Sequence, residues 1–309
     1  MTDIRYDAVI VGGGTAGLSA AQMLGRARRR TLVIDAGAPR NRFAAHMHGV
    51  LGHDGRSPAD LLETGRAEAR AYGVEFLDGA VLSLADDGDR ITVTHERGEV
   101  SARGVVLTTG VVDDLPEIPG LREQWGRGVF HCPYCHGYEV AGRRLGVLAT
   151  SPASLHQIEL IRQWSDDVTA FTAAMGELDE TVAGRLSARG IRIVTSPVTR
   201  LRTEDDAIVA AVTADGTAHP IDALLTAPTP RLSLAFAENL ALAVSDTPGE
   251  GLRVDMRGAT SHPRVFAAGN VVTPFGNVPL SMGQGSMAGA GLNAALVTED
   301  AAVASLARG

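Results

Sequence analysis

Cys132 and Cys135, followed at once by His136, are the residues of this chain best suited to chemistry, and they are its only cysteines. Two residues between thiols suit a small redox-active disulfide ring, in which a nearby positive charge or helix N-terminus lowers one thiol pKa. Half of a zinc site is the alternative, but a structural zinc ion usually needs four protein ligands, and the chain has no second cysteine pair. The remaining candidate ligands lie far upstream: His46, His48 and His53. The pattern therefore favours dithiol redox chemistry.

The first thirty-five residues predict the element that positions a cofactor. An apolar run at 8–11 predicts a buried strand, a glycine-rich turn follows at 12–17, and a helical pattern comes next. A second apolar run at 31–34 ends on Asp35. This order is a βαβ unit with an acid at its second strand end, which is typical of dinucleotide binding. The alternative is a glycine-rich turn without a ligand.

Within that turn, Gly12, Gly14 and Gly17 have the GxGxxG spacing, with Thr15 and Ala16 between the last two. Glycine at these positions lets the backbone approach a pyrophosphate and lets the helix pack close to the strand. The free N–H groups of the helix N-terminus then face the phosphates. The acid at the second strand end is placed to bind the ribose of the adenosine half.

A segment near the C-terminus indicates which dinucleotide is bound. Residues 260–270 predict a strand and turn before a helix that begins near Pro279. They resemble the second FAD signature of the flavoprotein disulfide reductases, with Asn270 where that family has an aspartate after the glycine. An amide there still donates or accepts a hydrogen bond but carries no charge. Residues 108–110 resemble the Ala-Thr-Gly turn at the exit of the flavin domain.

The order of these motifs resembles low-molecular-weight thioredoxin reductase along essentially the whole chain. The resemblance implies an α/β protein with two Rossmann-like, three-layer domains. It implies an FAD-binding domain formed by residues 1–113 and 243–309, split by an NADPH-domain-like insert at 114–242 that carries the two cysteines. The expected hinges lie near 113–116 and 245–248. The resemblance assigns FAD binding to Gly12, Gly14, Thr15, Ala16, Gly17, Asp35, Ala36, Gly37, Arg42, Val81, Thr109, Gly110, Gly269, Asn270 and Val278.

The same resemblance implies roles for the catalytic residues. Cys135 is the thiol next to the flavin, and Cys132 is the interchange thiol that reacts with substrate. His136 stands where the family has an aspartate that donates a proton. Imidazole titrates near neutrality and suits acid–base work on a thiol. The alternative for this histidine is a helix cap or a side chain that faces solvent.

The insert departs from the reductase pattern where NADPH binds. A strand is predicted at 144–150 and a helix at 155–164, but the turn between them, residues 149–154, contains no glycine. Ser151 before Pro152 predicts a helix N-cap with proline at the first helical position. After the next strand, at 167–171, no arginine cluster follows for the 2′-phosphate. Both halves of the coenzyme site are therefore expected to be degenerate.

Without coenzyme motifs, the Cys-Pro-Tyr-Cys-His-Gly run resembles the FAD-dependent dithiol oxidases that close disulfides in gliotoxin, holomycin and romidepsin biosynthesis. That resemblance implies oxidation of a small-molecule dithiol, with electrons passing to FAD and then to dioxygen to give hydrogen peroxide, in a homodimer. A reductase supplied by ferredoxin or by atypically bound NAD(P)H is the first alternative. A non-catalytic, redox-sensing flavoprotein is the second.

Composition excludes other classes of function. The chain has 45% hydrophobic and 21% charged residues, which is ordinary for a globular protein. Its net charge is −8, and every fixed cation is arginine, with no basic tract for nucleic acid. Neither a signal peptide nor a membrane-spanning run is predicted, so a cytoplasmic enzyme is expected, in which a CxxC pair is catalytic.

Two further groups of polar residues keep two interpretations each. Arg40 and Arg42 follow the acid of the βαβ unit, either as phosphate contacts or as part of a solvated turn. The three upstream histidines lie in a loop that the resemblance places near the flavin ring, either facing the active site or serving as ordinary loop residues.

Overall fold

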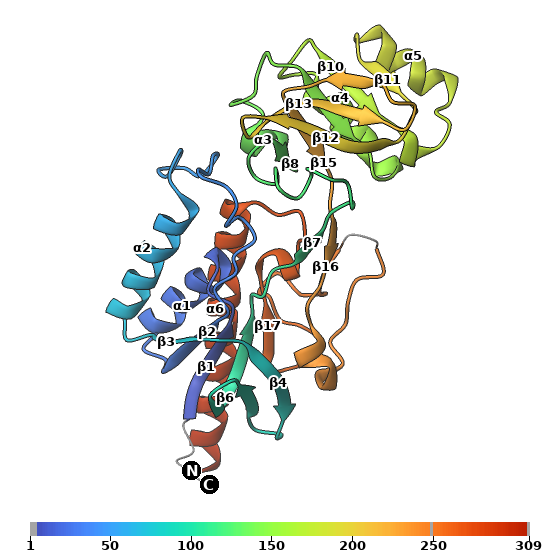
Figure 1. Cartoon of the computed structure of the whole chain (residues 1–309). Helices are drawn as coiled ribbons and strands as arrows, with labels where there is room; N and C mark the ends of the chain where they lie inside the picture. The colour runs from blue at the N-terminus through green and yellow to red at the C-terminus, as the bar shows by residue number, and fades with distance from the viewer. Residues whose placement is uncertain (1–4, 248–249, 308–309) are drawn as a thin grey trace. The chain divides into compact units, whose positions relative to one another are not determined.

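The computed structural model describes residues 5–247 and 250–307 and divides the chain into two compact units. The first unit comprises residues up to 42, residues 57–112 and residues from 230 onward; the second comprises 43–56 and 113–229. Each unit has a largely parallel sheet covered by helices (Figure 1), so the expected α/β class with two Rossmann-like domains is confirmed.

The unit boundaries differ from those expected from the sequence. The chain returns to the first unit at Pro230 and not at residue 243, and residues 43–56 belong to the second unit. The physical reason for the return at Pro230 is a pair of strands, β7 (Val112–Asp114) and β16 (Thr229–Arg231), which hydrogen-bond to each other. The crossings after Val112 and after Thr229 therefore both lie at this two-stranded sheet.

The elements of the first unit are β1 (Arg5–Val11), α1 (Thr15–Arg26), β2 (Thr31–Asp35), α2 (Pro58–Ala71), β3 (Glu75–Asp78), β4 (Val81–Asp86), β5 (Ile91–His95), β6 (Gly98–Leu107), β17 (Val265–Ala267) and α6 (Val278–Leu306). Their sheet has the order β3-β2-β1-β6-β5-β4. The first half of β6 pairs antiparallel with β5, and its end pairs parallel with β17. The strand, turn, helix and strand predicted for the first thirty-five residues are confirmed.

Alternate residues of β1 enter different hydrophobic cores on the two faces of the sheet. Val9 and Val11 pack in one core with residues of β4 and β5. Ala8 and Ile10 pack in the other with residues of α1 and α6. Because both faces are covered, the strand is apolar from Ala8 to Val11, as is typical of parallel sheets.

Helices α1 and α6 run side by side against the sheet (Figure 1). Glycines on α6 allow this close approach, because a Cβ on Gly285 would overlap the carbonyl of Ala16. A Cβ on Gly289 would lie 2.7 Å from the carbonyl oxygen of Ala20. The small residues of α6 therefore pack against the N-terminal half of α1, the helix that follows the glycine-rich turn.

The elements of the second unit are β8 (Val129–Phe130), α3 (Pro133–His136), β9 (Leu145–Leu148), α4 (Leu155–Ile161), β10 (Val168–Phe171), α5 (Glu180–Ala188), β11 (Arg192–Val194), β12 (Val198–Glu204), β13 (Ala207–Thr213), β14 (Ala218–Pro220) and β15 (Ala223–Thr226). A parallel sheet has the order β11-β10-β9-β15-β8, and β12, β13 and β14 form an antiparallel sheet. The helix expected at 155–164 ends earlier, at Ile161, because the N–H groups of Gln163 and Trp164 donate to carbonyls three residues back, those of Leu160 and Ile161, at 3.0 and 2.9 Å.

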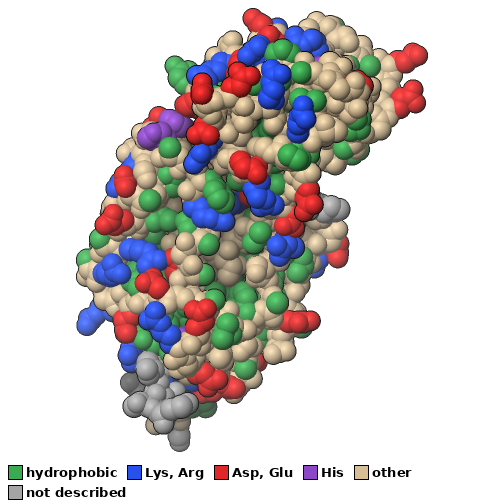
Figure 2. Space-filling view, in the orientation of Figure 1, with side chains coloured by type: hydrophobic (Ala, Val, Ile, Leu, Met, Phe, Trp, Pro, Cys, Tyr) green, Lys and Arg blue, Asp and Glu red, His purple; other side chains and the backbone are tan. Residues whose placement is uncertain are grey.

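Basic and acidic side chains are interspersed over the face drawn in Figure 2. Among the described residues, none of the helices has both the length and the apolar character needed to cross a bilayer.

Candidate active site and cofactor cradle

The two cysteines flank the first turn of the short helix α3. Cys132 is the residue before the helix, and Pro133 at the first helical position has no N–H to leave unpaired. The N–H of Cys135 donates to the carbonyl of Cys132 at 3.2 Å. Both side chains are half-buried thiols. The turn therefore places the sulfur of Cys132 near the backbone N–H groups of Tyr134 and Cys135.

The pKa values of the two thiols are shifted in opposite directions. The thiol of Cys135 donates a hydrogen bond to the sulfur of Cys132 and lowers its pKa to about 7, against burial and with help from the N–H groups of Cys135 and Tyr134. The same hydrogen bond, together with burial and the charge on Cys132, raises the pKa of Cys135. The reduced pair thus carries its negative charge on Cys132 and its proton on Cys135.

Alkylation of the reduced protein by iodoacetamide is expected to begin at Cys132, with a rate that rises with pH through a midpoint near 7. The rate rises because the thiolate is the nucleophile and its fraction grows as the pH passes the pKa. Mass spectrometry of quenched samples locates the label. A midpoint near that of an ordinary thiol, about 8.5, would contradict this charge distribution.

His136 ends α3 and stacks on Phe130 of β8, with ring centroids 4.5 Å apart and planes 15° from parallel. Burial lowers the pKa of this imidazole, the charge of Glu139 raises it, and the charge of His48 lowers it. Its Nδ1 atom is buried and has no hydrogen-bond partner among the described residues. A neutral imidazole with an unpartnered nitrogen is suited to accept a thiol proton.

The three upstream histidines make different contacts within residues 43–56. Nδ1 of His46 lies 3.1 Å from the carbonyl oxygen of Gly55, and Nδ1 of His53 lies 3.3 Å from a guanidinium nitrogen of Arg56. His48 lies between the carboxylates of Asp54 and Glu139. Over residues 5–247 and 250–307, no three His, Cys, Asp or Glu side chains are grouped so as to hold a metal ion.

Of the three glycines with the GxGxxG spacing, two pack closely and one leaves space. Gly12 has φ +105°, and a Cβ on it would lie 2.5 Å from the carbonyl oxygen of Thr108. A Cβ on Gly17 would overlap the carbonyl of Gly12. A Cβ on Gly14, by contrast, meets nothing within 4 Å, although Gly14 caps α1, which begins with Thr15 and Ala16. The open side of Gly14 lies at a helix N-terminus, where a phosphate binds readily.

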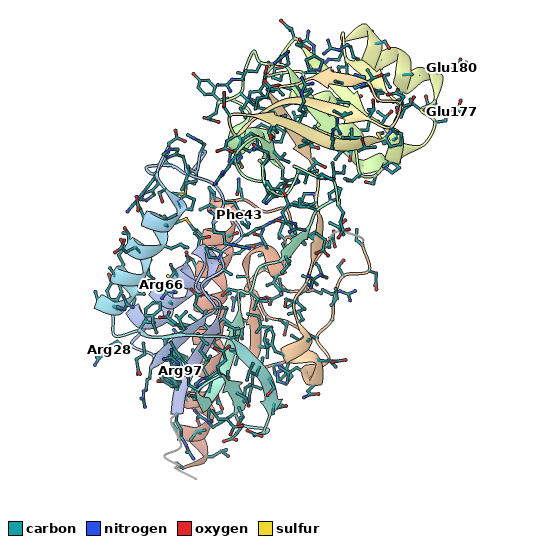
Figure 3. All side chains as sticks on the ribbon, in the orientation of Figure 1. Arg28, Phe43, Arg66, Arg97, Glu177 and Glu180 are labelled. Atoms are coloured by element: carbon teal, nitrogen blue, oxygen red, sulfur yellow. The ribbon has the colours of Figure 1, made fainter. Side chains whose placement is uncertain are left out.

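Asp35 ends β2, and its carboxylate accepts the N–H of Gly37, which follows Ala36, at 3.2 Å. An ion pair joins this carboxylate to Arg66 on α2 (Figure 3). The guanidinium of Arg66 also lies over the ring of Phe76, 5.3 Å from its centroid. Sequence reasoning missed Arg66, because an arginine on a helix gives no signal until the helix is placed beside the strand.

The turn after β6 contains a second feature that fits a bound ligand. The hydroxyl of Thr108 donates to the carbonyls of Val11 and Gly12, at 3.0 and 2.8 Å. The hydroxyl of Thr109 is buried, yet it has no hydrogen-bond partner in the described part of the chain. Gly110 follows with φ +67°. A buried polar atom without a partner is costly, so a ligand at this turn accounts for Thr109.

The turn at Gly269, after β17, lies next to the glycine-rich turn at the start of α1. Gly269 has φ +79°, and a Cβ on it would lie 2.8 Å from Cβ of Ala16. Its N–H donates to the side-chain oxygen of Gln284 at 3.0 Å. Val278 is the first residue of α6, capped by Asn277. Val81 begins β4, where it pairs with His95.

Asn270 has a structural reason to be an amide. Its Nδ2 donates to the carbonyls of Thr273 and Gly276, at 3.0 and 2.8 Å. A carboxylate could not donate either bond, so the aspartate of the family pattern would leave both carbonyls facing a negative charge. This amide fixes the loop that leads into α6.

Arg40 and Arg42 donate to backbone carbonyls in this structure. Arg40 hydrogen-bonds to the carbonyl of Pro274, and Arg42 donates to the carbonyls of Ala38 and Pro39 at 3.3 and 3.0 Å. Of their two interpretations, these contacts favour turn-stabilising side chains.

The turn at 149–154 is closed by its own side chains. The N–H of Thr150 donates to the hydroxyl of Ser154 at 3.1 Å, and the hydroxyl of Thr150 donates to the carbonyl of Ala227 at 3.0 Å. Ser151 is the N-cap residue of a short 3₁₀ turn that begins with Pro152, as predicted, but its side chain makes no cap hydrogen bond. Ser154 is buried at the start of α4 and takes the N–H of Thr150. The second unit thus lacks an open phosphate cradle at this turn.

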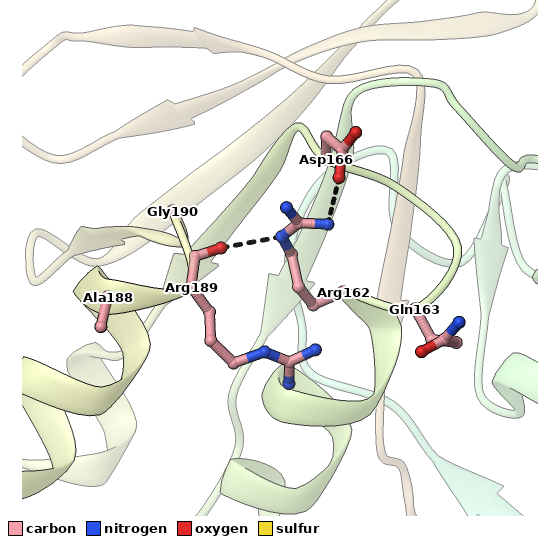
Figure 4. Close-up of a pocket in the computed structure, with 6 residues that line it drawn as sticks. All are labelled: Arg162, Gln163, Asp166, Ala188, Arg189 and Gly190. Atoms are coloured by element: carbon pink, nitrogen blue, oxygen red, sulfur yellow. Dashed lines mark hydrogen bonds and ion pairs between the residues drawn. The ribbon is translucent and has the colours of Figure 1, made fainter.

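A cavity of about 630 Å³ lies elsewhere in the second unit, beyond the ends of α4 and α5 (Figure 4). Arg162 contacts Asp166 and the carbonyl of Arg189 there. Neither cysteine lines this cavity. This cavity, which is open to the surface, is therefore separate from the dithiol site.

Comparisons with known proteins agree with this architecture. The family described as pyridine nucleotide-disulphide oxidoreductase matches residues 6–285. Thioredoxin reductase sirT of Leptosphaeria maculans is 32% identical over 308 residues, with 93% of each chain covered. The crystal structure of HlmI has a TM-score of 0.93 at 42% identity, covering 99% of this chain and 96% of that one. The oxidoreductase from Agrobacterium tumefaciens has a TM-score of 0.90 at 37% identity, with coverage of 96% and 99%.

Proposed function

Because this chain belongs to the pyridine nucleotide-disulphide oxidoreductase family, with thioredoxin-reductase-like relatives, we propose that it is an FAD-dependent dithiol oxidase. It closes a disulfide in a small-molecule dithiol and gives hydrogen peroxide from dioxygen. The observation that carries the proposal is the turn at 149–154, which contains no glycine and in which the hydroxyl of Ser154 accepts the N–H of Thr150. Because this turn offers no open site for a coenzyme phosphate, we take the substrate dithiol as the electron donor in place of NADPH.

The residues of the first unit fit FAD. The open side of Gly14 at the N-terminus of α1 would receive the pyrophosphate, and Asp35 would bind the ribose. The unpartnered hydroxyl of Thr109 would gain a hydrogen-bond partner. When bound, FAD would take up the electron pair of the reduced dithiol and pass it to dioxygen.

The exchange steps follow from the unequal thiols. A substrate thiolate attacks the sulfur of Cys132, a mixed disulfide forms, the Cys132–Cys135 bond breaks, and Cys135 leaves as a thiolate. The second substrate thiolate attacks the substrate sulfur of the mixed disulfide, which forms the product disulfide and releases Cys132. Because the pKa of Cys132 is lowered to about 7, Cys132 is a good leaving group in this second step.

His136 is the base in this proposal. The two substrate thiols lose two protons as the disulfide closes, and the departing Cys135 thiolate takes up one of them. The neutral imidazole of His136, next to Cys135 in the chain, accepts the other at Nδ1 and returns it to solvent. Burial, which lowers the pKa of His136, keeps the ring neutral and ready to accept that proton.

A second candidate function is disulfide reduction, because relatives of this chain carry the name thioredoxin reductase. In that direction ferredoxin or an atypically bound nicotinamide would supply electrons. We place either reaction in the cytoplasm and in a homodimer, and we propose neither a nucleic-acid nor a membrane partner. Both functions use the same cysteines, so the electron donor distinguishes them.

The test uses the purified FAD-loaded protein with dithiothreitol in air, followed by oxygen uptake and peroxide formation. We expect sustained turnover with no added coenzyme, with peroxide formed in proportion to the dithiol consumed. Bleaching of the flavin by NADPH, with electrons reaching thioredoxin, would instead support the reductase. Absence of turnover with every donor would leave the redox-sensing alternative.

A further inference from the structure

His48 is held beside the segment that follows the two cysteines. Its Nε2 lies 3.4 Å from a carboxylate oxygen of Glu139, and its Nδ1 lies 3.5 Å from a carboxylate oxygen of Asp54. The side chain is only 24% exposed. A proton on either ring nitrogen therefore faces a carboxylate, from its own loop or from the residues after α3.

The loop that carries His48 is fixed by its own hydrogen bonds. The N–H of Met47 donates to the carbonyl of Arg56, and the N–H of Gly55 donates to the carbonyl of Met47, both at 2.9 Å. The carboxylate of Asp54 accepts the N–H of Gly49 at 3.0 Å. At the start of the loop, Phe43 (labelled in Figure 3) packs against Gly126, where a Cβ would lie 2.8 Å from Cβ of Phe43. These contacts tie the backbone on both sides of His48 to the rest of the loop.

Glu139 follows Cys135 by four residues and His136 by three in the same short segment. Its charge raises the pKa of Cys135 and also raises the pKa of His136. The charge of His48 has the opposite effect on His136 and lowers its pKa. The titratable groups around His136 are therefore Cys132, Cys135 and Glu139 from its own segment, and His48 and Asp54 from residues 43–56.

We propose that His48 and Glu139 form a positioning pair for the dithiol site, in which the Glu139 carboxylate sets a negative charge beside Cys135 and His136 and the His48 imidazole balances it. The inference rests on the proposed role of His136 as the base. It assigns a role to one of the three loop histidines, and the pair joins residues 43–56 to the rest of the cysteine-bearing unit.

The pair affects catalysis because the charges of His48 and Glu139 act on both groups that take up a substrate proton, Cys135 and His136. An unbalanced carboxylate would make Cys135 a poorer leaving group and would keep His136 protonated, and so unable to accept a proton, at higher pH. Removal of the carboxylate would instead leave the base less able to hold a proton. The balance therefore keeps His136 able both to accept and to release a proton near neutral pH.

The test is the titration of His136 in the reduced protein, followed by NMR of the imidazole C–H signals and assigned with a His136→Gln variant. Replacement His48→Gln is expected to raise the titration midpoint by about half a pH unit, and Glu139→Gln to lower it by about as much. The double variant is expected to return close to the wild-type midpoint, because both members of the pair are then neutral.

His46→Gln is the matched control, since His46 lies in the same loop and its ring contacts the carbonyl of Gly55. It should leave the midpoint of His136 unchanged. The proposal would be wrong if the titration midpoint of His136 were unchanged in both single variants, or if it moved in the same direction in both. If His48→Gln lowers the melting temperature, the Glu139→Gln shift alone decides. Absence of peroxide formation would refute the oxidase without affecting this titration.

Discussion

Replacement of Cys135 by serine is expected to stop reduction of the bound flavin by dithiothreitol, lowering its rate by roughly a thousand-fold or more. The substitution removes the sulfur that shares its proton with Cys132, so no internal disulfide can form or break. Anaerobic bleaching of the flavin absorbance measures the rate. The FAD content should stay at the wild-type level, because Cys135 lies in α3 and not in the glycine-rich cradle.

Cys132→Ser is the companion variant, and it separates the two thiols. Cys135→Ser retains the interchange thiol of Cys132 and should accumulate a mixed disulfide when treated with a linear disulfide, whereas Cys132→Ser should react with iodoacetamide only at alkaline pH, because burial raises the pKa of the remaining Cys135 thiol. Retention of flavin reduction in either variant would contradict an electron path through both sulfurs.

The parts of the fold that were predicted are those that local chain geometry dictates. The strand, glycine turn, helix and acid at 8–35 are adjacent in sequence, so apolar periodicity and glycine spacing were sufficient. The cysteine pair was equally local. Because Pro133 and the N–H of Cys135 are neighbours of Cys132, the turn that acidifies its thiol is encoded within four residues.

The parts that were missed depend on contacts between distant segments. Arg66 pairs with Asp35 only because α2 packs beside β2, and nothing in its own neighbourhood predicts that. Asn270 departs from the family pattern because of two carbonyls that the following loop brings back to it. The assignment of residues 43–56 to the second unit likewise depends on tertiary contacts and not on composition.

Replacement of Gly14 by threonine is expected to weaken FAD binding about ten- to a hundred-fold while leaving the folded apoprotein intact. Gly14 has φ −73° and ψ −174°, an extended conformation that threonine adopts, and it occupies the N-cap of α1, where threonine is as favourable as glycine. Its Cβ meets no protein atom within 4 Å, so the added side chain enters only the space assigned to the pyrophosphate.

The FAD content of purified protein and the melting temperature of the apoprotein together decide this prediction. Gly17→Ala should lower both, because its Cβ would overlap the carbonyl of Gly12 and force the helix away from the strand. Gly184→Ala in α5, where a Cβ also meets nothing, should change neither except to stabilise the helix by up to about 1 kcal/mol. Full FAD content in Gly14→Thr would mean that the pyrophosphate does not lie against this turn, and the cofactor assignment of the first unit would then fail with it.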